Sequence, residues 1–338
     1  MKLKSILTVA FLSTVTASYA QEADAPLEIS GSVDAYYKYD FSKHPNIPTS
    51  FASDQNSISI GMIDLALKKT TGKASFVGEL SFGPRGQGQS LLPEGEESFH
   101  IQNLYASYAF TDKFSMTAGF MGTFIGYEVI SPAANFNYST SYLFTSGPFQ
   151  NAGIKATYAF TDKVSLMVGL FNDWNLYTDF NGVSHVGAQL TVSPVEGWTA
   201  YLNVLSGKSE GVPGTGTIFD LTTAYQVTEK FKLGLNAADY SVSGDNGGYT
   251  GAALYPQYAF SPSVALGLRG EYLNWKGAQG ADDEHVIAGT LSANIKAGGL
   301  TFIPEVRLDN LSNEGFYKEN GELTKKAAQF SLAFVYAF

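Results

Sequence analysis

The chain contains no cysteine among its 338 residues. It therefore has no disulfide framework, no thiolate metal site and no cysteine nucleophile. Basic residues are also scarce, because 21 lysines and arginines stand against 31 acidic residues and give a formal net charge of −10. Nucleic-acid binding needs a basic surface, so the sequence argues against a nucleic acid as a partner.

Long apolar runs are missing too, since no stretch of about 18 consecutive apolar residues follows residue 20. No membrane helix is therefore predicted. Charged residues make up only 15% of the chain, whereas tyrosine and phenylalanine are frequent. This composition suits a soluble β-sandwich or β-solenoid. It equally suits a membrane barrel, in which lipid-facing and lumen-facing residues alternate and hide the membrane surface from the average hydropathy.

The N-terminus has the layout of a secretory signal peptide. Lys2 and Lys4 precede a short apolar run, and Ser18-Tyr19-Ala20 forms a small-x-small cleavage site. The alternative is a buried N-terminal helix. We expect residues 1–20 to be removed, which would lower the net charge from −10 to −12, and residues 21–338 to form a single domain.

Period-two alternation is the strongest structural signal in the chain. From Ile29 to Phe41 the odd positions are mostly apolar and the even positions mostly polar. The last segment carries its large side chains on one face, with Ala328, Phe330, Leu332, Phe334, Tyr336 and Phe338. One face suits lipid and the other suits water, so the pattern favours the membrane barrel over the soluble sandwich.

Sixteen such segments of about ten residues can be recognised, the length that a tilted membrane strand needs. A change of parity between Ile60 and Ile63 predicts a β-bulge near Gly61. The expected strands are 29–41, 56–69, 73–82, 99–110, 114–124, 151–160, 164–174, 184–193, 198–206, 217–227, 231–241, 249–260, 264–275, 284–296, 300–309 and 327–338. Fourteen or eighteen strands are the alternatives.

Connections between these segments alternate between short and long, as in bacterial barrels with short periplasmic turns and long extracellular loops. Aromatic residues gather beside the short turns, which predicts an aromatic belt at the periplasmic interface. The predicted fold class is all-β, a closed transmembrane antiparallel β-barrel. The expected long loops are 42–55, 83–98, 125–150, 175–183, 207–216, 242–248, 276–283 and 310–326.

The longest loop, 125–150, is rich in aromatic residues and has one charge, Glu128. A loop in water would carry more charge and fewer aromatics. We therefore expect this loop to fold into the lumen and to narrow it, the alternative being a packed surface loop. The expected constriction residues are Tyr127, Glu128, Asn135, Tyr138 and Tyr142.

Charged side chains on the lumen-facing positions of the strands are candidates for ion selection. Glu128 opposite Lys155, Arg269 or Arg307 would give a transverse field, whereas the simpler reading is that these charges solvate the wall. The expected basic lumen residues are Lys38, Lys155, Lys232, Arg269 and Arg307, and the expected acidic ones are Asp34, Glu79, Asp220, Glu271 and Glu305.

Loop 125–150 also carries a resemblance to a known family. Gly126-Tyr127-Glu128-Val129-Ile130-x-Pro132, the aromatic and polar run 135–144, and Gly147-Pro148-Phe149 with Gly153 resemble the OmpL-like β-barrel porins. The specific match covers about thirty residues and a looser one nearly the whole mature chain. The resemblance implies a porin-like barrel in the outer membrane of a Gram-negative bacterium and names no solute. The final Phe338 resembles the signal by which the barrel assembly machinery recognises the last strand.

The expected function is passive diffusion of small hydrophilic solutes, with no catalytic residue, cofactor or metal. The alternatives are a non-conducting structural or adhesin barrel and a sugar-selective channel using the rings of Tyr127, Phe136, Tyr138, Tyr142 and Phe144. An enzyme is the remaining rival, but the four histidines lack any motif. Membrane lipid and lipopolysaccharide are expected partners, and the sequence leaves open a homotrimer. Acidic runs at 94–97 and 282–284 could hold divalent cations or be solvated loop tips.

Overall fold

The computed structural model describes residues 25–87, 99–179 and 182–338. Across these residues sixteen strands close into one antiparallel barrel, in which β1 pairs with β18. This confirms the predicted fold class. The barrel strands are β1 (Glu28–Asp40), β2 (Ser57–Thr71), β3 (Ala74–Phe82), β4 (Phe99–Ala109), β5 (Phe114–Gly122), β6 (Gln150–Thr161), β7 (Val164–Phe171), β8 (His185–Val192), β9 (Trp198–Gly207), β10 (Gly216–Gln226), β11 (Phe231–Val242), β12 (Asn246–Ser261), β13 (Val264–Ala278), β14 (Glu284–Ala297), β15 (Leu300–Leu311) and β18 (Lys326–Ala337).

Smaller elements lie in the connections. A two-stranded sheet of β16 (Phe316–Tyr317) and β17 (Leu323–Thr324) joins β15 to β18. Helical turns are α1 (Pro84–Gln87), η1 (Pro132–Ala134) and α2 (Tyr142–Ser146). Helices in the described part of the chain are all too short to cross a membrane. The expected signal peptide and the acidic run 94–97 lie outside the described residues.

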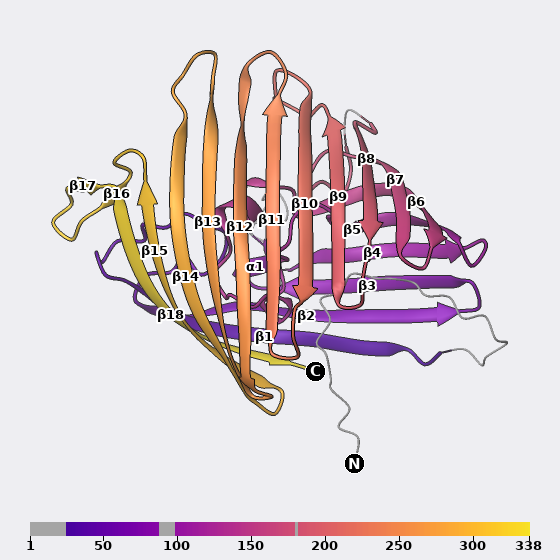
Figure 1. Cartoon of the computed structure of the whole chain (residues 1–338), viewed down its shortest axis with the longest axis horizontal. Coiled ribbons are helices and arrows are strands. Elements are labelled where there is room, and N and C mark those ends of the chain that lie inside the picture. The colour runs from indigo at the N-terminus through magenta and orange to yellow at the C-terminus, as the bar shows by residue number, and fades with distance from the viewer. Residues whose placement is uncertain (1–24, 88–98, 180–181) are drawn as a thin grey trace.

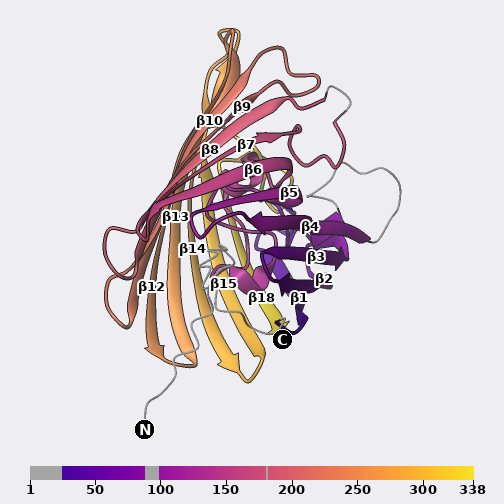
Figure 2. The same cartoon turned by 90° about the vertical axis from the view of Figure 1, so that its right-hand side faces the viewer.

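The strands coil around the barrel axis. In Figure 1, β1 to β3 run almost horizontally while β10 to β14 stand upright, and Figure 2 shows the same wall from the side. Such tilting follows from closing a twisted sheet on itself. The connections of β10 to β14 are short at both ends, and the predicted long loop 242–248 is reduced to residues 243–245 because β11 and β12 extend further than predicted.

The two faces of the wall differ as the alternation predicted. On β7 the outward side chains Val168 and Leu170 are about half exposed, whereas the inward Phe171 is fully buried. Aromatic pairs recur beside the tight turns, with ring centroids 4.9–5.2 Å apart. These pairs are Tyr108–Phe110, Tyr158–Phe160 and Tyr258–Phe260.

The predicted β-bulge on β2 is present. Val33 of β1 pairs with Ile63, but Ala35 pairs with Ile60, so β2 carries an extra residue there. Asp34 fills the bulge, and its carboxylate accepts a hydrogen bond from the Met62 amide at 2.8 Å. A Cβ atom on Gly61 would lie 1.9 Å from the Asp34 carboxylate. Glycine is therefore required at residue 61 of this bulge.

The repeated Thr-Asp-Lys and Thr-Glu-Lys turns have a local explanation. The Thr111 hydroxyl accepts hydrogen bonds from the amides of Lys113 and Phe114 at 3.2 and 3.0 Å. Thr228 does the same for Lys230 and Phe231. A threonine at the first turn position thus supplies a side-chain acceptor for the amides of a tight turn.

Candidate functional site

The connection between β5 and β6, residues 123–149, packs against inward-facing side chains from much of the barrel. Its contacts run from β7 and β8, through β10 to β15, to β1. At its start the amide of Gly126 donates to Asp220 of β10 at 3.1 Å. The ring of Tyr127 then stacks on Tyr255 of β12, with centroids 4.4 Å apart.

Glycines on the inner wall seat the aromatic rings of this segment. A Cβ atom on Gly187 would lie 2.6 Å from the ring of Phe124, and one on Gly267 would lie 2.3 Å from the ring of Phe136. A Cβ atom on Gly234 would come within 2.5 Å of the Tyr127 hydroxyl. The rings can therefore lie this close to the wall only because these strand positions lack side chains.

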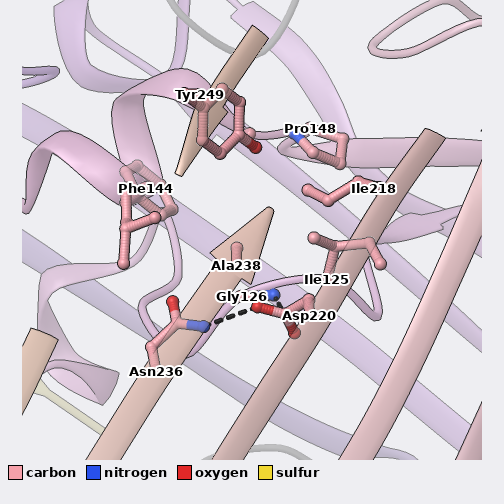
Figure 3. Close-up of a pocket in the computed structure, with 11 residues that line it drawn as sticks. Ile125, Gly126, Phe144, Pro148, Ile218, Asp220, Asn236, Ala238 and Tyr249 are labelled. Atoms are coloured by element: carbon pink, nitrogen blue, oxygen red, sulfur yellow. Dashed lines mark hydrogen bonds between the residues drawn. The ribbon is translucent and has the colours of Figure 1, made fainter. Parts of the chain in front are cut away.

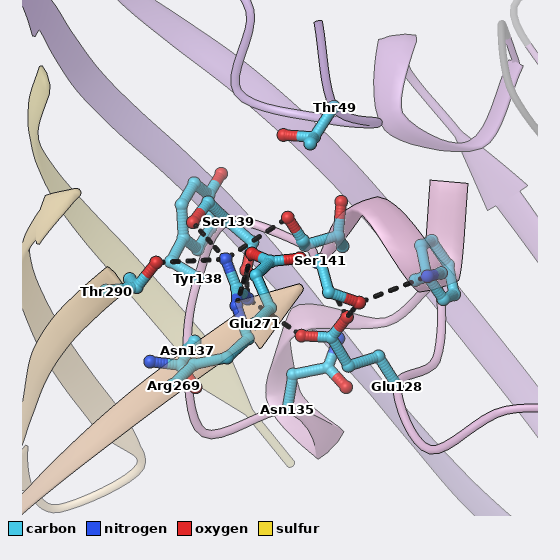
Figure 4. A network of polar contacts seen from close by, with 12 residues as sticks. Thr49, Glu128, Asn135, Asn137, Tyr138, Ser139, Ser141, Arg269, Glu271 and Thr290 are labelled. Atoms are coloured by element: carbon cyan, nitrogen blue, oxygen red, sulfur yellow. Dashed lines mark hydrogen bonds and ion pairs between the residues drawn. The ribbon is translucent and has the colours of Figure 1, made fainter. Parts of the chain in front are cut away.

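Arg269 of β13 is the centre of the polar contact (Figure 4). Its guanidinium lies 2.8 Å from the Glu128 carboxylate and donates to the carbonyls of Ser139 and Thr140 at 2.5 and 3.2 Å. Its Nε contacts Glu271 of the same strand at 3.2 Å. Arg269 has no exposed surface, so its guanidinium interacts only with the groups of this cluster.

Arg307 of β15 binds the same stretch of backbone. Its guanidinium donates to the Thr140 carbonyl at 2.7 Å and pairs with Asp309 at 2.8 Å. It lies 5.0 Å from the ring centroid of Tyr142, whose hydroxyl donates to Asp309. Two wall arginines thus converge on one loop carbonyl, and both are charge-compensated by neighbouring carboxylates.

Arg85 of α1 completes the set, so that all three arginines of the chain donate to backbone carbonyls of residues 123–149. It donates to Ile130 and Tyr138 at 3.0 and 3.1 Å. Its guanidinium lies between the rings of Phe51 and Tyr138, 4.4 and 4.7 Å from their centroids. Asp34 lies 3.7 Å away and balances its charge.

Wall carboxylates bind the amides of the same segment. Glu305 accepts from the amides of Tyr138 and Ser139 at 2.9 and 3.1 Å. Glu271 accepts from the Tyr142 amide at 2.7 Å. The segment is therefore held by backbone donors and acceptors alike, which fixes its path more tightly than side-chain packing alone would.

A second connection, 41–56, packs on the first one. The Thr140 hydroxyl donates to the Ser50 carbonyl at 2.6 Å, and the Ser50 amide donates to Thr145 at 2.9 Å. Ile47 and Phe51 are buried. The prediction of 42–55 as a long extracellular loop did not include this contact. The two apolar side chains explain it, because they find cover against residues 123–149 and the wall.

The connection that contains β16 and β17 also binds residues 41–56. The side chain of Asn46 donates to the Tyr317 carbonyl and accepts from the Tyr317 amide, each at 2.8 Å. Phe316 is almost fully buried beside Ile47. Three connections distant in sequence therefore form one interlocked unit against the wall.

Asp220 of β10 binds the start of the 123–149 segment. Its carboxylate accepts hydrogen bonds from Gly126, Asn203 and Asn236, and Figure 3 shows Asn236 pointing at it. The cavity lined by Asp220, Gly126, Asn236 and Ile125, among others, measures about 10 Å³. That volume suits about one water molecule and is far too small for a solute.

The predicted constriction residues take different positions. Glu128, Tyr138 and Tyr142 are 7%, 0% and 2% exposed, so they lie within the contact between segment and wall. Tyr127 and Asn135 keep part of their surface exposed. Glu128 touches Arg269 directly and does not face it across an open gap.

The predicted basic residues also divide into two groups. Arg269, Arg307 and Lys38 are buried, and the Lys38 ammonium donates to the Ser53 carbonyl at 3.2 Å. Lys155 of β6 and Lys232 of β11 remain partly exposed on the inner wall. The sequence placed all five on the same face but could not tell which of them the connections would cover.

The acidic run 282–284 forms no metal-ligand cluster, and none occurs elsewhere in the described residues. Asp283 accepts hydrogen bonds from the Asn274 side chain at 2.7 Å and the Gly277 amide at 2.9 Å. These donors lower the pKa of the Asp283 carboxyl. The carboxylate thus caps its own loop.

Comparisons with known proteins agree with the barrel. Residues 26–338 match the family described as "Putative beta-barrel porin-2, OmpL-like". No curated protein matches the sequence. Solved structures with the same fold include the outer membrane channel DcaP of Acinetobacter baumannii, with 14% identity, a TM-score of 0.67, and 95% of this chain and 100% of that chain covered.

Two further barrels are similar in fold. OmpF of Salmonella typhi in complex with daunomycin has 13% identity and a TM-score of 0.65, covering 94% of this chain and 100% of that one. In-vitro folded OmpT of Vibrio cholerae in its trimer form has 13% identity and a TM-score of 0.60, with 94% and 100% covered. At these identities the likeness concerns the fold. The family match over nearly the whole chain goes further, and the protein therefore belongs to the OmpL-like β-barrel porin family, as a multi-pass β-barrel of the outer membrane.

Proposed function

We propose that the protein is a passive outer-membrane channel for small hydrophilic solutes, narrowed by residues 123–149. The main supporting observation is that Arg269 and Arg307 of the inner wall, Arg85 of α1 and several wall carboxylates bind the backbone of this segment. A segment held in this way would occupy part of the cross-section permanently. The solute would pass through what remains open.

The exposed fraction of the inward side chains indicates which part of the lumen stays open. Inward side chains in the middle of β13 and β15, such as Arg269 and Arg307, are fully covered. On β3 to β6, by contrast, the inward Glu79, Tyr105 and Lys155 stay partly exposed, although Met121 of β5 and Phe171 of β7 are buried. This polar, partly exposed part of the wall supports a water-filled path beside β3 to β6.

The other candidate functions have less support. Tyr138 and Tyr142 are almost fully buried, so their ring faces are not available to stack on a sugar. The family and the fold are those of porins, which are channels and not enzymes, and we take this protein as non-enzymatic. A non-conducting structural barrel is the alternative that only a conductance measurement separates from a channel.

The test is single-channel recording of the refolded protein in a planar lipid bilayer. We expect stable stepwise openings from material that is heat-modifiable on gels, which reports a folded barrel. Folded protein that never conducts would overturn the proposal in favour of a structural barrel. The proposed homotrimer, suggested by the trimer form of the V. cholerae protein, is checked separately by the mass of the detergent-solubilised assembly.

A further inference from the structure

We propose that Glu79 of β3 and Lys155 of β6, and not Glu128 with the arginines, are the charges that a permeating solute meets. This inference rests on the proposed channel function and assigns its charge selectivity to two wall residues. Charges that are covered by the 123–149 segment are already paired, so they cannot contact a solute.

Both side chains point into the barrel. The residues next to Glu79 and Lys155 in sequence, Leu80 and Ile154, are 41% and 43% exposed on the outer face. Since side chains alternate along a strand, Glu79 and Lys155 lie on the inner face. Each remains partly exposed there, in contrast to the fully covered Arg269.

The two charges lie at nearly the same height in the wall. Glu79 is the sixth residue of β3 (Ala74–Phe82), counted from its tight turn. Lys155 is the seventh residue from the turn at the end of β6 (Gln150–Thr161). Both turns lie at the same end of the barrel, so the heights differ by about one residue, or about 3 Å along a strand.

Their lateral separation prevents them from neutralising each other. Strands β4 and β5 lie between β3 and β6, and the strand register places Lys155 in line with Ser75, four residues from Glu79. Three strand spacings of about 4.8 Å and four residues of about 3.3 Å put the two residues about 19 Å apart along the curved wall. In the described ranges the side-chain ammonium of Lys155 takes part in no hydrogen bond or ion pair. Glu79 accepts a hydrogen bond from Asn103 at 2.5 Å, which orients its carboxylate without cancelling its charge.

The wall between them carries no net charge. Its inward residues are Tyr105 and Ser107 on β4 and Thr117 on β5, and the last two hydrogen bond to each other at 2.7 Å. A carboxylate and an ammonium separated by neutral polar groups produce a field along the wall. Small polar solutes with a dipole or with charges of both signs would be oriented by this field as they pass.

The test uses reversal potentials in a salt gradient across a planar bilayer. Lys155→Gln should shift the cation-to-anion permeability ratio toward cations, and Glu79→Gln should shift it toward anions. Each shift should be about twofold, the effect of a unit charge about 10 Å from an ion in water. The matched controls are Lys163→Gln, which removes a charge in an exposed turn, and Glu128→Gln, which removes a charge in the buried cluster.

The absence of cysteine allows a second measurement that does not depend on selectivity. Glu79→Cys and Lys155→Cys should react with charged thiosulfonate reagents in the folded protein, whereas Glu128→Cys should not. Unchanged reversal potentials in both glutamine variants, or protection of both cysteines, would overturn the assignment while leaving the channel intact. A wild-type barrel that does not conduct would instead overturn the proposed function, and the labelling pattern would still test which residues face open lumen.

Discussion

The carboxylate of Glu128 lies 2.8 Å from the guanidinium of Arg269, and both side chains are buried. The two charges therefore compensate each other inside the contact between residues 123–149 and the wall. Arg269 also contacts Glu271, so the cluster stays balanced when one carboxylate is changed. We therefore expect the pair to stabilise the packing of residues 123–149 on the wall and not to select ions.

Glu128→Gln should leave the reversal potential nearly unchanged while weakening the hold on the segment. The amide oxygen can still accept from the Ser141 amide and hydroxyl, but the charge that pairs with Arg269 is lost, so we expect a loss of about 1–3 kcal/mol in unfolding free energy. Urea unfolding in lipid vesicles measures this loss. A clear shift of selectivity without loss of stability would assign Glu128 to the open path after all.

Gly267→Ala should disturb the seat of Phe136, because the new Cβ atom would lie 2.3 Å from its ring. The cost should be about 1–3 kcal/mol, as for other overpacked sites. The matched control is Gly270→Ala on the same strand, whose Cβ atom would have no atom within 4 Å. Equal stability of the two variants would mean that Phe136 moves aside freely.

Arg85→Gln should loosen the segment most, since it releases the carbonyls of Ile130 and Tyr138 and leaves Asp34 without its cation. Breaking one partner of a buried pair typically costs about 3–5 kcal/mol. We expect noisier single-channel currents and faster amide hydrogen exchange in residues 128–142. Wild-type currents and exchange rates would show that the other two arginines suffice.

Gly61→Ala should damage assembly more than permeation. The added Cβ atom would collide with the Asp34 carboxylate in the β2 bulge, 1.9 Å away. Slower appearance of the heat-modifiable form during refolding is the expected readout. Gly78→Ala on β3 is the control, because its Cβ atom would point into open space. Identical refolding of both variants would contradict a need for glycine at the bulge.

The alternation of side chains determined the barrel by itself. Period-two patterning, turn chemistry such as that of Thr111 and the parity change at Gly61 are local properties, so they could be read without knowing any distant contact. Each predicted strand overlaps an observed one. The inward orientation of Arg269, Arg307 and Lys155 followed from the same rule.

What only the tertiary structure decided is which inward residues are covered. Ile47 and Phe51 lie more than seventy residues before the segment they pack on, and Gly267 lies under a ring from residue 136. Such pairings depend on how connections fold across a closed barrel, which no local pattern encodes. For that reason Glu128 and Lys155 are equally good lumen charges by sequence, whereas in the structure Glu128 is buried against Arg269 and Lys155 stays partly exposed on the inner wall.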